Sequence, residues 1–466
     1  MPVIVLVADG ARADALAGDL EGLPALRRLR EEGGLHEVTS VFPSVTGPAY
    51  TPFLMGRFPG PIGIPGLRWY DRARTTCGWP DHARSYVGYE MGRIDGDLDA
   101  EAPTIFDLVP NSVAALSVVT RGLSREARVG GITPRSALRA AVTHFRGQAE
   151  RWLELDRQVA DEIIRRMREE RPDYLFAALT GVDKASHARG HEHAMVREAL
   201  AIVDDTVGRL RADAEAGGWW DETHLWIVSD HGHGRVHTHD DLADAVSSAG
   251  HRTVAHPWSF GIAPDAAVMV SGNAMAHVYV ELKARERVGW AALEARWQPL
   301  ADALLRRPSV DLLLLPHSAD RCEVRSAERG AAMIERQGNC FRYRRHWKGD
   351  PLNYGSDFFG CADDVHEATR DGNYPDAIVQ IAMLAGSARA GDLILSAAPG
   401  FDFRRKYEPI PHRSAHGALH REHMMVPLLT NRRPARAPRR TTDLFASTLA
   451  ALGVAAPAVM DGASFL

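Results

Sequence analysis

The chain has 466 residues, and 55 Lys and Arg against 60 Asp and Glu give it a formal net charge of −5. Hydrophobic residues make up 45% and charged residues 25%, which are ordinary globular values and exclude a disordered, collagen-like or coiled-coil chain. No basic excess supports wrapping by nucleic acid. The composition is unusual in one respect, because 21 His accompany only 4 Cys. Imidazole is the commonest metal ligand among side chains, so a gathering of these histidines would indicate a metal site.

The cysteines and the N-terminus indicate a soluble protein of a reducing compartment. No two cysteines have the CxxC spacing of a zinc knuckle or a thioredoxin-type site, and four scattered cysteines do not make a disulfide framework. The apolar run at residues 3–8 is too short for a signal peptide or a membrane span. We therefore expect a cytoplasmic protein without a membrane segment.

Strand patterns and helix patterns alternate along most of the chain. Continuous apolar and β-branched runs are typical of strands buried on both faces, and apolar residues every three to four positions are typical of amphipathic helices. In chain order, strands are expected at 3–8, 35–42, 111–120, 173–179 and 224–229, and helices at 24–32, 147–170 and 195–210. This alternation predicts an α/β fold, a three-layer sandwich with a mostly parallel central sheet.

Residues 265–369 depart from this alternation. They contain a predicted helix at 290–306, a strand at 310–316 and a hairpin at 331–345. We interpret them as a small α+β insertion, a cap or recognition subdomain, between core segments 1–264 and 370–466. Some of its aromatic residues could stack on a base, although such residues more often form the core of a small domain. They are Trp347, Tyr354, Phe358 and Phe359.

Acidic and imidazole side chains follow several of the predicted strands, where ligands collect in a parallel α/β sheet. A lone Asp at such a place is usually a helix cap, and an Asp-His pair four residues apart is more often an ordinary surface pair. Adjacent Asp and His at the end of a strand are harder to explain without a ligand. The residues are, in chain order, Asp9, Asp183 with His187, Asp230 with His231, and His416.

Thr46 follows the strand at 35–42 and precedes a predicted helix that opens with Gly47 and Pro48. The simplest interpretation is a helix N-cap. The same position also suits a nucleophile, because free N–H groups and the positive end of the helix dipole stabilise a phosphoryl oxygen there. Ser44 is a weaker candidate, since it lies further from the start of the helix.

The order of these residues resembles the alkaline phosphatase superfamily, and most closely its type I phosphodiesterase/nucleotide pyrophosphatase branch. The resemblance spans nearly the whole chain. The motifs that carry it are VADGARAD, FPSVTGPAYTPFLMG, TGVDKASHARG, VSDHG, SAHG and the C-terminal RTTDLFASTLAALGV.

The resemblance implies an alkaline-phosphatase-like core that hydrolyses small phosphate esters with two divalent metal ions and a covalent phospho-Thr46 intermediate. It implies a first ion on Asp9, Asp230, His231 and Thr46, and a second ion on Asp183, His187 and His416. The mixed nitrogen and oxygen donors suit Zn²⁺, with Mn²⁺ or Fe as alternatives.

The sequence departs from the branch at one position. Where the branch has an Asn that donates to a phosphoryl oxygen, the stretch GIPGLRWYDR has Leu67. The donor could come from Arg68, Arg72 or Arg413 instead.

A phosphodiesterase therefore remains the main hypothesis, with a phosphomonoesterase or a phosphonate ester hydrolase as the alternative. A metal-binding protein without catalysis and a phosphomutase-type transferase are weaker options. Sulfate esters are not expected as main substrates, because the sequence has no CxPxR sulfatase signature.

Overall fold

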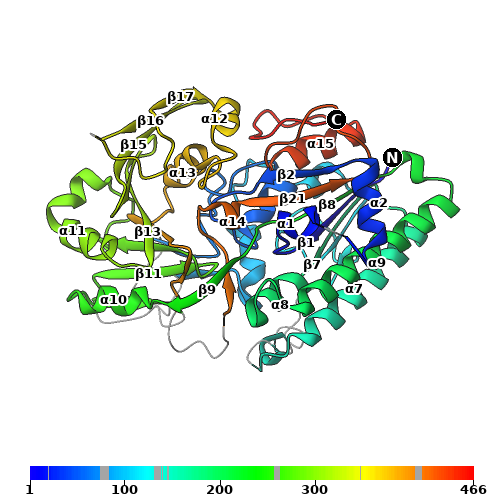
Figure 1. Cartoon of the computed structure of the whole chain (residues 1–466), viewed down its shortest axis with the longest axis horizontal. Coiled ribbons are helices and arrows are strands. Elements are labelled where there is room, and N and C mark those ends of the chain that lie inside the picture. The colour runs from blue at the N-terminus through cyan, green and yellow to red at the C-terminus, as the bar shows by residue number, and fades with distance from the viewer. Residues whose placement is uncertain are drawn as a thin grey trace.

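The computed structural model describes residues 1–466 except 19, 74–82, 131–137, 139, 144–145, 257–262, 347 and 405–411. Two large β-sheets organise it, one of seven strands and one of nine. They lie beside each other in Figure 1, each with its own helices. Among the described residues, no helix has both the length and the apolar character needed to cross a membrane.

The seven-stranded sheet has the order β2-β21-β8-β1-β7-β5-β6. Its strands are β1 (Val3–Ala8), β2 (Leu35–Thr39), β5 (Ser112–Ala115), β6 (Arg128–Val129), β7 (Tyr174–Leu179), β8 (His224–Val228) and β21 (Met425–Thr430). The neighbours of β1, which are β7 and β8, both run parallel to it. Strand β21 is antiparallel to both of its neighbours, β2 and β8, and the other adjacent pairs among the described strands of this sheet are parallel. The predicted mostly parallel central sheet is confirmed.

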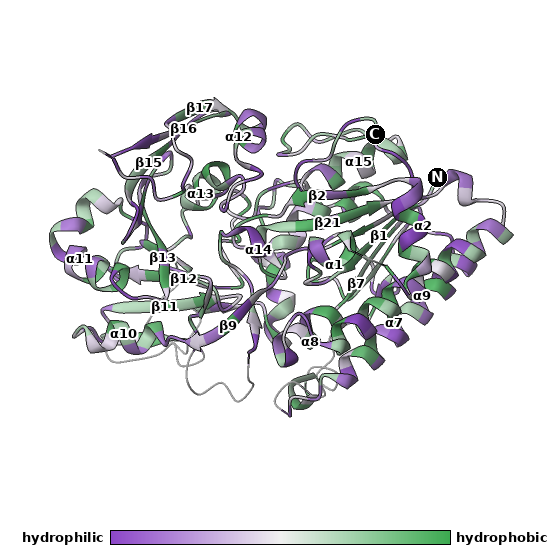
Figure 2. Ribbon diagram, viewed as in Figure 1, coloured by the Kyte–Doolittle hydropathy of each residue, from purple (hydrophilic) through white to green (hydrophobic). Residues whose placement is uncertain are grey.

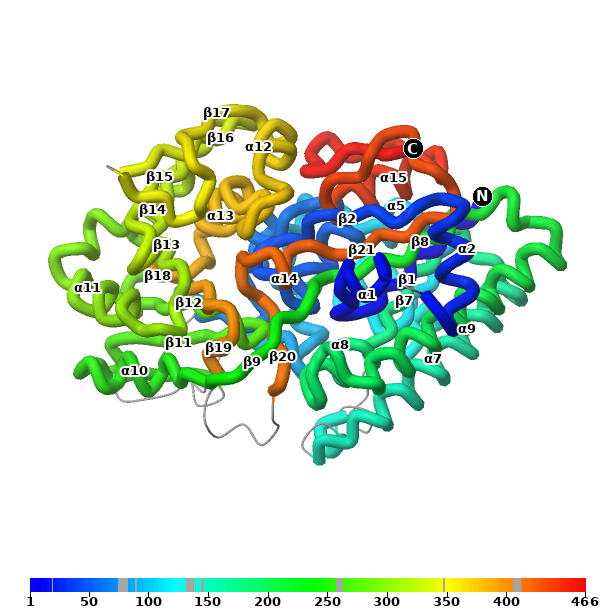
Figure 3. The backbone as a smooth tube through the Cα atoms, in the orientation of Figure 1, coloured from blue at the N-terminus to red at the C-terminus, as the bar shows by residue number. Residues whose placement is uncertain are grey.

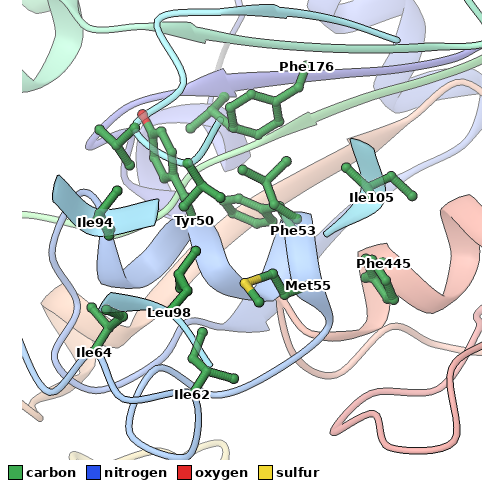
Figure 4. Close-up of a cluster of buried hydrophobic side chains, with 14 of the residues drawn as sticks. Tyr50, Phe53, Met55, Ile62, Ile64, Ile94, Leu98, Ile105, Phe176 and Phe445 are labelled. Atoms are coloured by element: carbon green, nitrogen blue, oxygen red, sulfur yellow. The ribbon is translucent and has the colours of Figure 1, made fainter. Parts of the chain in front are cut away.

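Helices cover both faces of this sheet. Successive side chains of β1 point to opposite faces, and all of them are buried, so both faces are covered at this strand. Val3, Val5 and Val7 join a core that includes Tyr50 and Phe53, shown in Figure 4. The intervening residues of β1 face the other core, which α2, α7 and α9 supply. The bounds of the covering helices are α2 (Pro24–Glu32), α3 (Thr51–Met55), α7 (Glu150–Glu169), α9 (Ala194–Ala216) and α15 (Asp443–Leu452). In Figure 2 the central strands are hydrophobic and the hydrophilic residues of α7 and α9 lie on their outer sides.

The nine-stranded sheet has the order β10-β11-β12-β18-β13-β14-β15-β16-β17. Its strands are β10 (Thr253–Ala255), β11 (Ala266–Ser271), β12 (Met275–Val280), β13 (Val310–Ser318), β14 (Arg321–Ser326), β15 (Gly330–Gln337), β16 (Cys340–Arg345), β17 (Phe358–Cys361) and β18 (Leu393–Ala397). The predicted hairpin is confirmed, since β15 and β16 pair antiparallel from Gln337 and Cys340 onward.

This second sheet extends past both ends of the predicted insertion 265–369. Strand β10 precedes it, and β18, assigned from the sequence to the resumed core, lies antiparallel between β12 and β13. The run Leu393–Ala397 is buried throughout. Such a run fits the middle of either sheet, so its sequence could not show which sheet it joins.

Shorter elements complete the fold. The helices are α1 (Ala13–Ala17), α4 (Ile94–Asp97), α5 (Ile105–Leu108), α8 (Gly181–Arg189), α10 (Leu242–Ser248), α11 (Trp290–Leu305), α12 (Ala362–Thr369), α13 (Ala377–Ala385) and α14 (Arg421–Met424), with 3₁₀ turns at Pro48–Tyr50, Gly88–Arg93 and Trp220–Glu222. Strands β3 (Arg68–Tyr70) and β4 (Ala83–Ser85) pair with each other. A further sheet has the order β19-β9-β20, from β9 (Gly234–His239), β19 (Gly400–Asp402) and β20 (Ser414–Ala415), and Figure 3 places it between the two large sheets.

Candidate metal centre

Three aspartates meet at one edge of the central sheet. Asp9 follows β1, Asp230 follows β8, and Asp183 lies in the first turn of α8, directly after β7. Because β8, β1 and β7 are adjacent and parallel, their carboxyl ends lie side by side. All three side chains are buried, so the fold concentrates negative charge at this point.

The small sheet β19-β9-β20 brings His416 to the same edge of the central sheet. Strand β20 pairs antiparallel with β9, with Ala415 opposite Gly234. His416 also forms a bridge with Asn273 at the end of β11. The rings of His231 and His416 are stacked, with centroids 3.5 Å apart and planes 4° from parallel. Residues separated by 185 positions in the chain therefore share one site.

The first cluster consists of Asp9, Asp230 and His231, whose ligand atoms lie within 4.8 Å of one another. His231 Nε2 is 3.4 Å from Asp9 Oδ1 and 3.5 Å from Asp230 Oδ2. The hydroxyl of Thr46 is 3.4 Å from Asp9 Oδ1 and 3.2 Å from His231 Nε2. The residues predicted to surround the first ion are thus in mutual contact.

The second cluster is centred on Asp183. Its Oδ1 lies 3.1 Å from His187 Nε2, 3.0 Å from His233 Nε2 and 3.7 Å from His416 Nε2. Two triads have ligand atoms within 4.8 Å of one another, one of Asp183, His187 and His233 and the other of Asp183, His231 and His416.

His233 is therefore part of the cluster, although it is not among the ligands predicted from the sequence. The available signal was its position two residues after His231, because alternate residues of an extended segment point the same way.

The imidazoles are oriented as metal ligands usually are. The Nδ1 atoms of His187, His416 and His231 lie 2.8, 2.9 and 3.1 Å from the backbone carbonyls of Ser414, Ser44 and Gly232. A carbonyl only accepts, so each Nδ1 carries a hydrogen, and Nε2 is the ring nitrogen that faces the carboxylates and can offer a lone pair to a metal ion. Lone pairs that face carboxylate oxygens repel them unless a cation lies between.

The spacing of the donors also fits a cation. Donor atoms about 2 Å from a tetrahedral ion are about 3.3 Å apart, and the contacts between the predicted ligands run from 3.1 to 3.7 Å. Asp230 Oδ1 accepts the N–H of Gly10, whereas Asp230 Oδ2 is buried without a hydrogen-bond partner. A bare buried carboxylate oxygen of this kind is costly unless it binds a metal ion.

The pKa values of the buried aspartates and of His416 are shifted by burial and by neighbouring charges, in ways that agree with a bound cation. Burial, together with the Asp230 and Asp183 carboxylates, holds the pKa of Asp9 well above its ordinary value. Burial would also raise the pKa of Asp183, but the ammonium of Lys184, whose Nζ is 2.7 Å from Asp183 Oδ2, favours the ionised carboxylate, and this pKa lies well below the ordinary value. Burial lowers the pKa of His416, which keeps the imidazole in the neutral form that ligates metals.

The three arginines predicted to bind substrate lie in different surroundings. Arg413 is exposed, and its backbone N–H donates to the carbonyl of His187, so it borders the centre. The backbone N–H of Arg68 donates to the hydroxyl of Ser271. The next residue, Gly272, lies against the backbone of His416. Arg72 is buried, forms an ion pair with Asp392, and donates to the carbonyl of Val280. The guanidinium of Arg72 is therefore bound by protein groups at the C-terminal end of β12.

Leu67 lies beside Gly47, the residue that follows Thr46. A side-chain carbon built on Gly47 would be 3.8 Å from Leu67 Cδ1, and the same carbon would be 3.9 Å from Ile94 and from Val118. The residue after the hydroxyl thus faces an apolar wall. Of the aromatic residues in the predicted insertion, Phe359 is exposed while Phe358 and Tyr354 pack against the core, and Trp347 lies outside the described residues.

Comparisons with known proteins agree with this geometry. The family model described as type I phosphodiesterase/nucleotide pyrophosphatase matches residues 3–419. A comparison with curated proteins finds no match.

Among solved structures, murine ectonucleotide pyrophosphatase/phosphodiesterase 5 is similar over 99% of this chain and 98% of its own, at 15% identity and a TM-score of 0.61. The human protein of that name is similar over 99% and 97%, at 14% identity and a TM-score of 0.58. Phosphonoacetate hydrolase from Sinorhizobium meliloti, in complex with phosphonoformate, is similar over 97% and 95%, at 17% identity and a TM-score of 0.56.

Proposed function

Because the chain belongs to the type I phosphodiesterase/nucleotide pyrophosphatase family, we propose that it hydrolyses small phosphate esters through a covalent phospho-Thr46 intermediate. The observation that carries this proposal is the contact of the Thr46 hydroxyl with both Asp9 and His231. The side chain of Thr46 is partly exposed, whereas Asp9 and His231 are buried. A substrate can therefore reach the hydroxyl at the edge of the cluster.

The donor set fits two divalent ions, and the proposed ligands are those that the sequence indicates. Asp9, Asp230 and His231 would hold the first, beside Thr46. Asp183 would hold the second with His187 and His416, whose Nε2 atoms lie 3.1 and 3.7 Å from Asp183 Oδ1. Such ions supply Lewis-acid stabilisation of the charge that develops on the attacking and leaving oxygens. Zn²⁺ suits the nitrogen and oxygen donors, with Mn²⁺ or Fe as alternatives.

The protein's own residues then perform two displacements. Thr46 Oγ1 forms a bond to phosphorus while the bond from phosphorus to the ester oxygen of the leaving group breaks. The Thr46 hydroxyl lies 3.4 Å from Asp9 Oδ1, which can accept its proton as the bond to phosphorus forms, while the leaving oxygen takes up a proton from solvent. A water molecule then attacks phosphorus and breaks the Oγ1–P bond, which regenerates Thr46 and releases the phosphorylated product.

Leu67 favours a second candidate, a phosphomonoesterase or a phosphonate ester hydrolase on the same residues. The apolar wall of Leu67, Ile94 and Val118 beside Gly47 has no side-chain donor for a phosphoryl oxygen. A diester that depends on such a donor would lose part of its transition-state stabilisation here. The fold similarity to phosphonoacetate hydrolase makes phosphonates worth testing.

Metal analysis of the purified protein, joined to rates on a nucleotide diester, an aryl phosphate monoester and a phosphonate ester, tests the proposal. We expect two bound ions and turnover of at least one ester class. Thr46→Ala should fold and lose turnover, while Thr46→Ser should retain part of it because a hydroxyl remains.

The neighbouring hydroxyl of Ser44 donates to the carbonyl of Ala418 and serves as the matched control. Ser44→Ala should keep turnover. Full activity of Thr46→Ala would refute the nucleophile assignment, and loss only in Ser44→Ala would transfer that role to Ser44.

A further inference from the structure

His233 is as deeply buried in the centre as the proposed ligands, yet it has no assigned role. Its side chain has no exposed area, and its Nε2 lies 3.0 Å from Asp183 Oδ1. Its ring meets that of His187 edge to face, with centroids 5.0 Å apart. Gly10, at φ +77°, leaves room for it, since a side-chain carbon on Gly10 would lie 2.7 Å from His233 Nε2. The local backbone is thus shaped around this imidazole.

The hydrogen-bond partners of His233 differ from those of His187, His231 and His416. Those three rings place Nδ1 against a backbone carbonyl, which frees Nε2 as a lone pair. In the part of the chain that the structure describes, Nδ1 of His233 is buried without a partner. A hydrogen on that Nδ1 would be an unsatisfied buried donor, which costs about 1–3 kcal/mol. The favoured neutral tautomer therefore carries its hydrogen on Nε2, which points at Asp183.

The acceptor capacity of Asp183 accounts for this donor. Lys184 occupies Oδ2, with Nζ at 2.7 Å. Oδ1 lies 3.1 Å from the Nε2 atom of His187, 3.0 Å from that of His233 and 3.7 Å from that of His416. A carboxylate oxygen has two lone pairs, so Oδ1 can bind a cation with one and accept a hydrogen bond with the other.

We propose that His233 is a positioning residue that donates its Nε2–H to Asp183 Oδ1 and, together with Lys184, fixes Asp183 as a one-oxygen ligand of the second metal ion. This inference rests on the metal centre of the proposed function. Its distinctive content is that His233 acts on the metal through Asp183 and does not bind the metal itself.

The test is metal binding by wild type, His233→Leu and His233→Gln, with Zn²⁺ affinity from competition with a chromophoric chelator. Loss of a hydrogen-bond partner of a ligand typically costs 10- to 100-fold in metal affinity. We expect that loss at one of two sites in His233→Leu and substantial recovery in His233→Gln, whose amide can donate. Circular dichroism checks that both variants fold.

The absorption spectrum of the Co²⁺-substituted protein separates a donor from a ligand. Bands of unchanged position and intensity in fully loaded His233→Gln support the donor role, because the coordination sphere is intact. A change to the bands of a different coordination number would overturn it and make His233 a ligand.

A matched control is His239→Leu on β9, which removes an imidazole 2.7 Å from Asp402 instead of Asp183. It should bind both ions as wild type does. Wild-type affinity at both sites in His233→Leu would overturn the inference alone, whereas failure of the wild type to bind any of these ions would overturn the proposed function with it.

Discussion

Asp230→Asn is expected to stabilise the metal-free protein and to destabilise the metal-loaded one. The ligand oxygens of Asp9 and Asp230 lie within 4.8 Å of each other, and both side chains are buried. Two unit charges at 4.8 Å repel by about 3.5 kcal/mol at an effective dielectric constant of ~20. Burial raises the pKa of both carboxyls. Because the wild-type pair can relieve its repulsion by taking up a proton, we expect a gain of about 1–3 kcal/mol.

The amide preserves the other contacts of this residue. Its oxygen can still accept the Gly10 N–H that Asp230 Oδ1 accepts, and its NH₂ group replaces Oδ2, which has no hydrogen-bond partner. The assay is equilibrium urea unfolding at pH 7, once with excess chelator and once with excess Zn²⁺. With Zn²⁺ the order should reverse, since an ion at about 1,000 times its dissociation constant adds about 4.1 kcal/mol that the variant loses at its first site.

Asp156→Asn is the matched control. Asp156 is a buried aspartate whose two oxygens accept the N–H groups of Thr180 and Gly181, at 2.9 and 2.7 Å. An amide has only one acceptor oxygen, so this variant should be less stable in both conditions. If chelated Asp230→Asn is no more stable than chelated wild type, like-charge repulsion is not a net cost in this centre and the reasoning is wrong.

Three further predictions concern acid sensitivity, a buried ion pair and the backbone beneath the centre. Burial lowers the pKa of His277 from 6.5 to about 4. Between these pH values only the unfolded state takes up the proton. The free energy of unfolding therefore falls by roughly 3 kcal/mol as the pH drops through that window. In urea unfolding, His277→Gln should depend less steeply on pH there, and an unchanged slope would contradict the assignment. Arg72→Met leaves Asp392 buried without the ion pair and should cost about 3 kcal/mol with KM unchanged, whereas a raised KM at unchanged stability would make Arg72 a substrate-binding residue. Gly10→Ala forces a carbon 2.7 Å from His233 Nε2 and 3.1 Å from Asp183 Cα, so metal analysis should find the second ion lost, and two ions bound at wild-type affinity would show that the centre can shift to admit a methyl group.

Local signals were sufficient for the central sheet and for most of the centre. The apolar runs of β1, β7 and β8 are long enough to identify buried strands. The polar residues that follow them must meet at one edge once the strands are parallel. Asp9, Asp183 and Asp230 could therefore be placed together from the sequence alone, without any knowledge of the contacts between them.

The sequence by itself determined the α/β class, the parallel strands and the residue types that gather at their ends. Tertiary pairing decided the extent of the second sheet. The run Leu393–Ala397 is apolar enough for the middle of either sheet, and only its antiparallel pairing with β12 and β13 shows that it belongs to the second. The same holds for His233 and for Arg72. A histidine becomes a partner of Asp183, and an arginine becomes a partner of Asp392, only when distant strands bring them within hydrogen-bond distance. Hydrophobic periodicity is a local property of the chain, whereas the partner of a polar side chain depends on contacts between residues far apart in sequence.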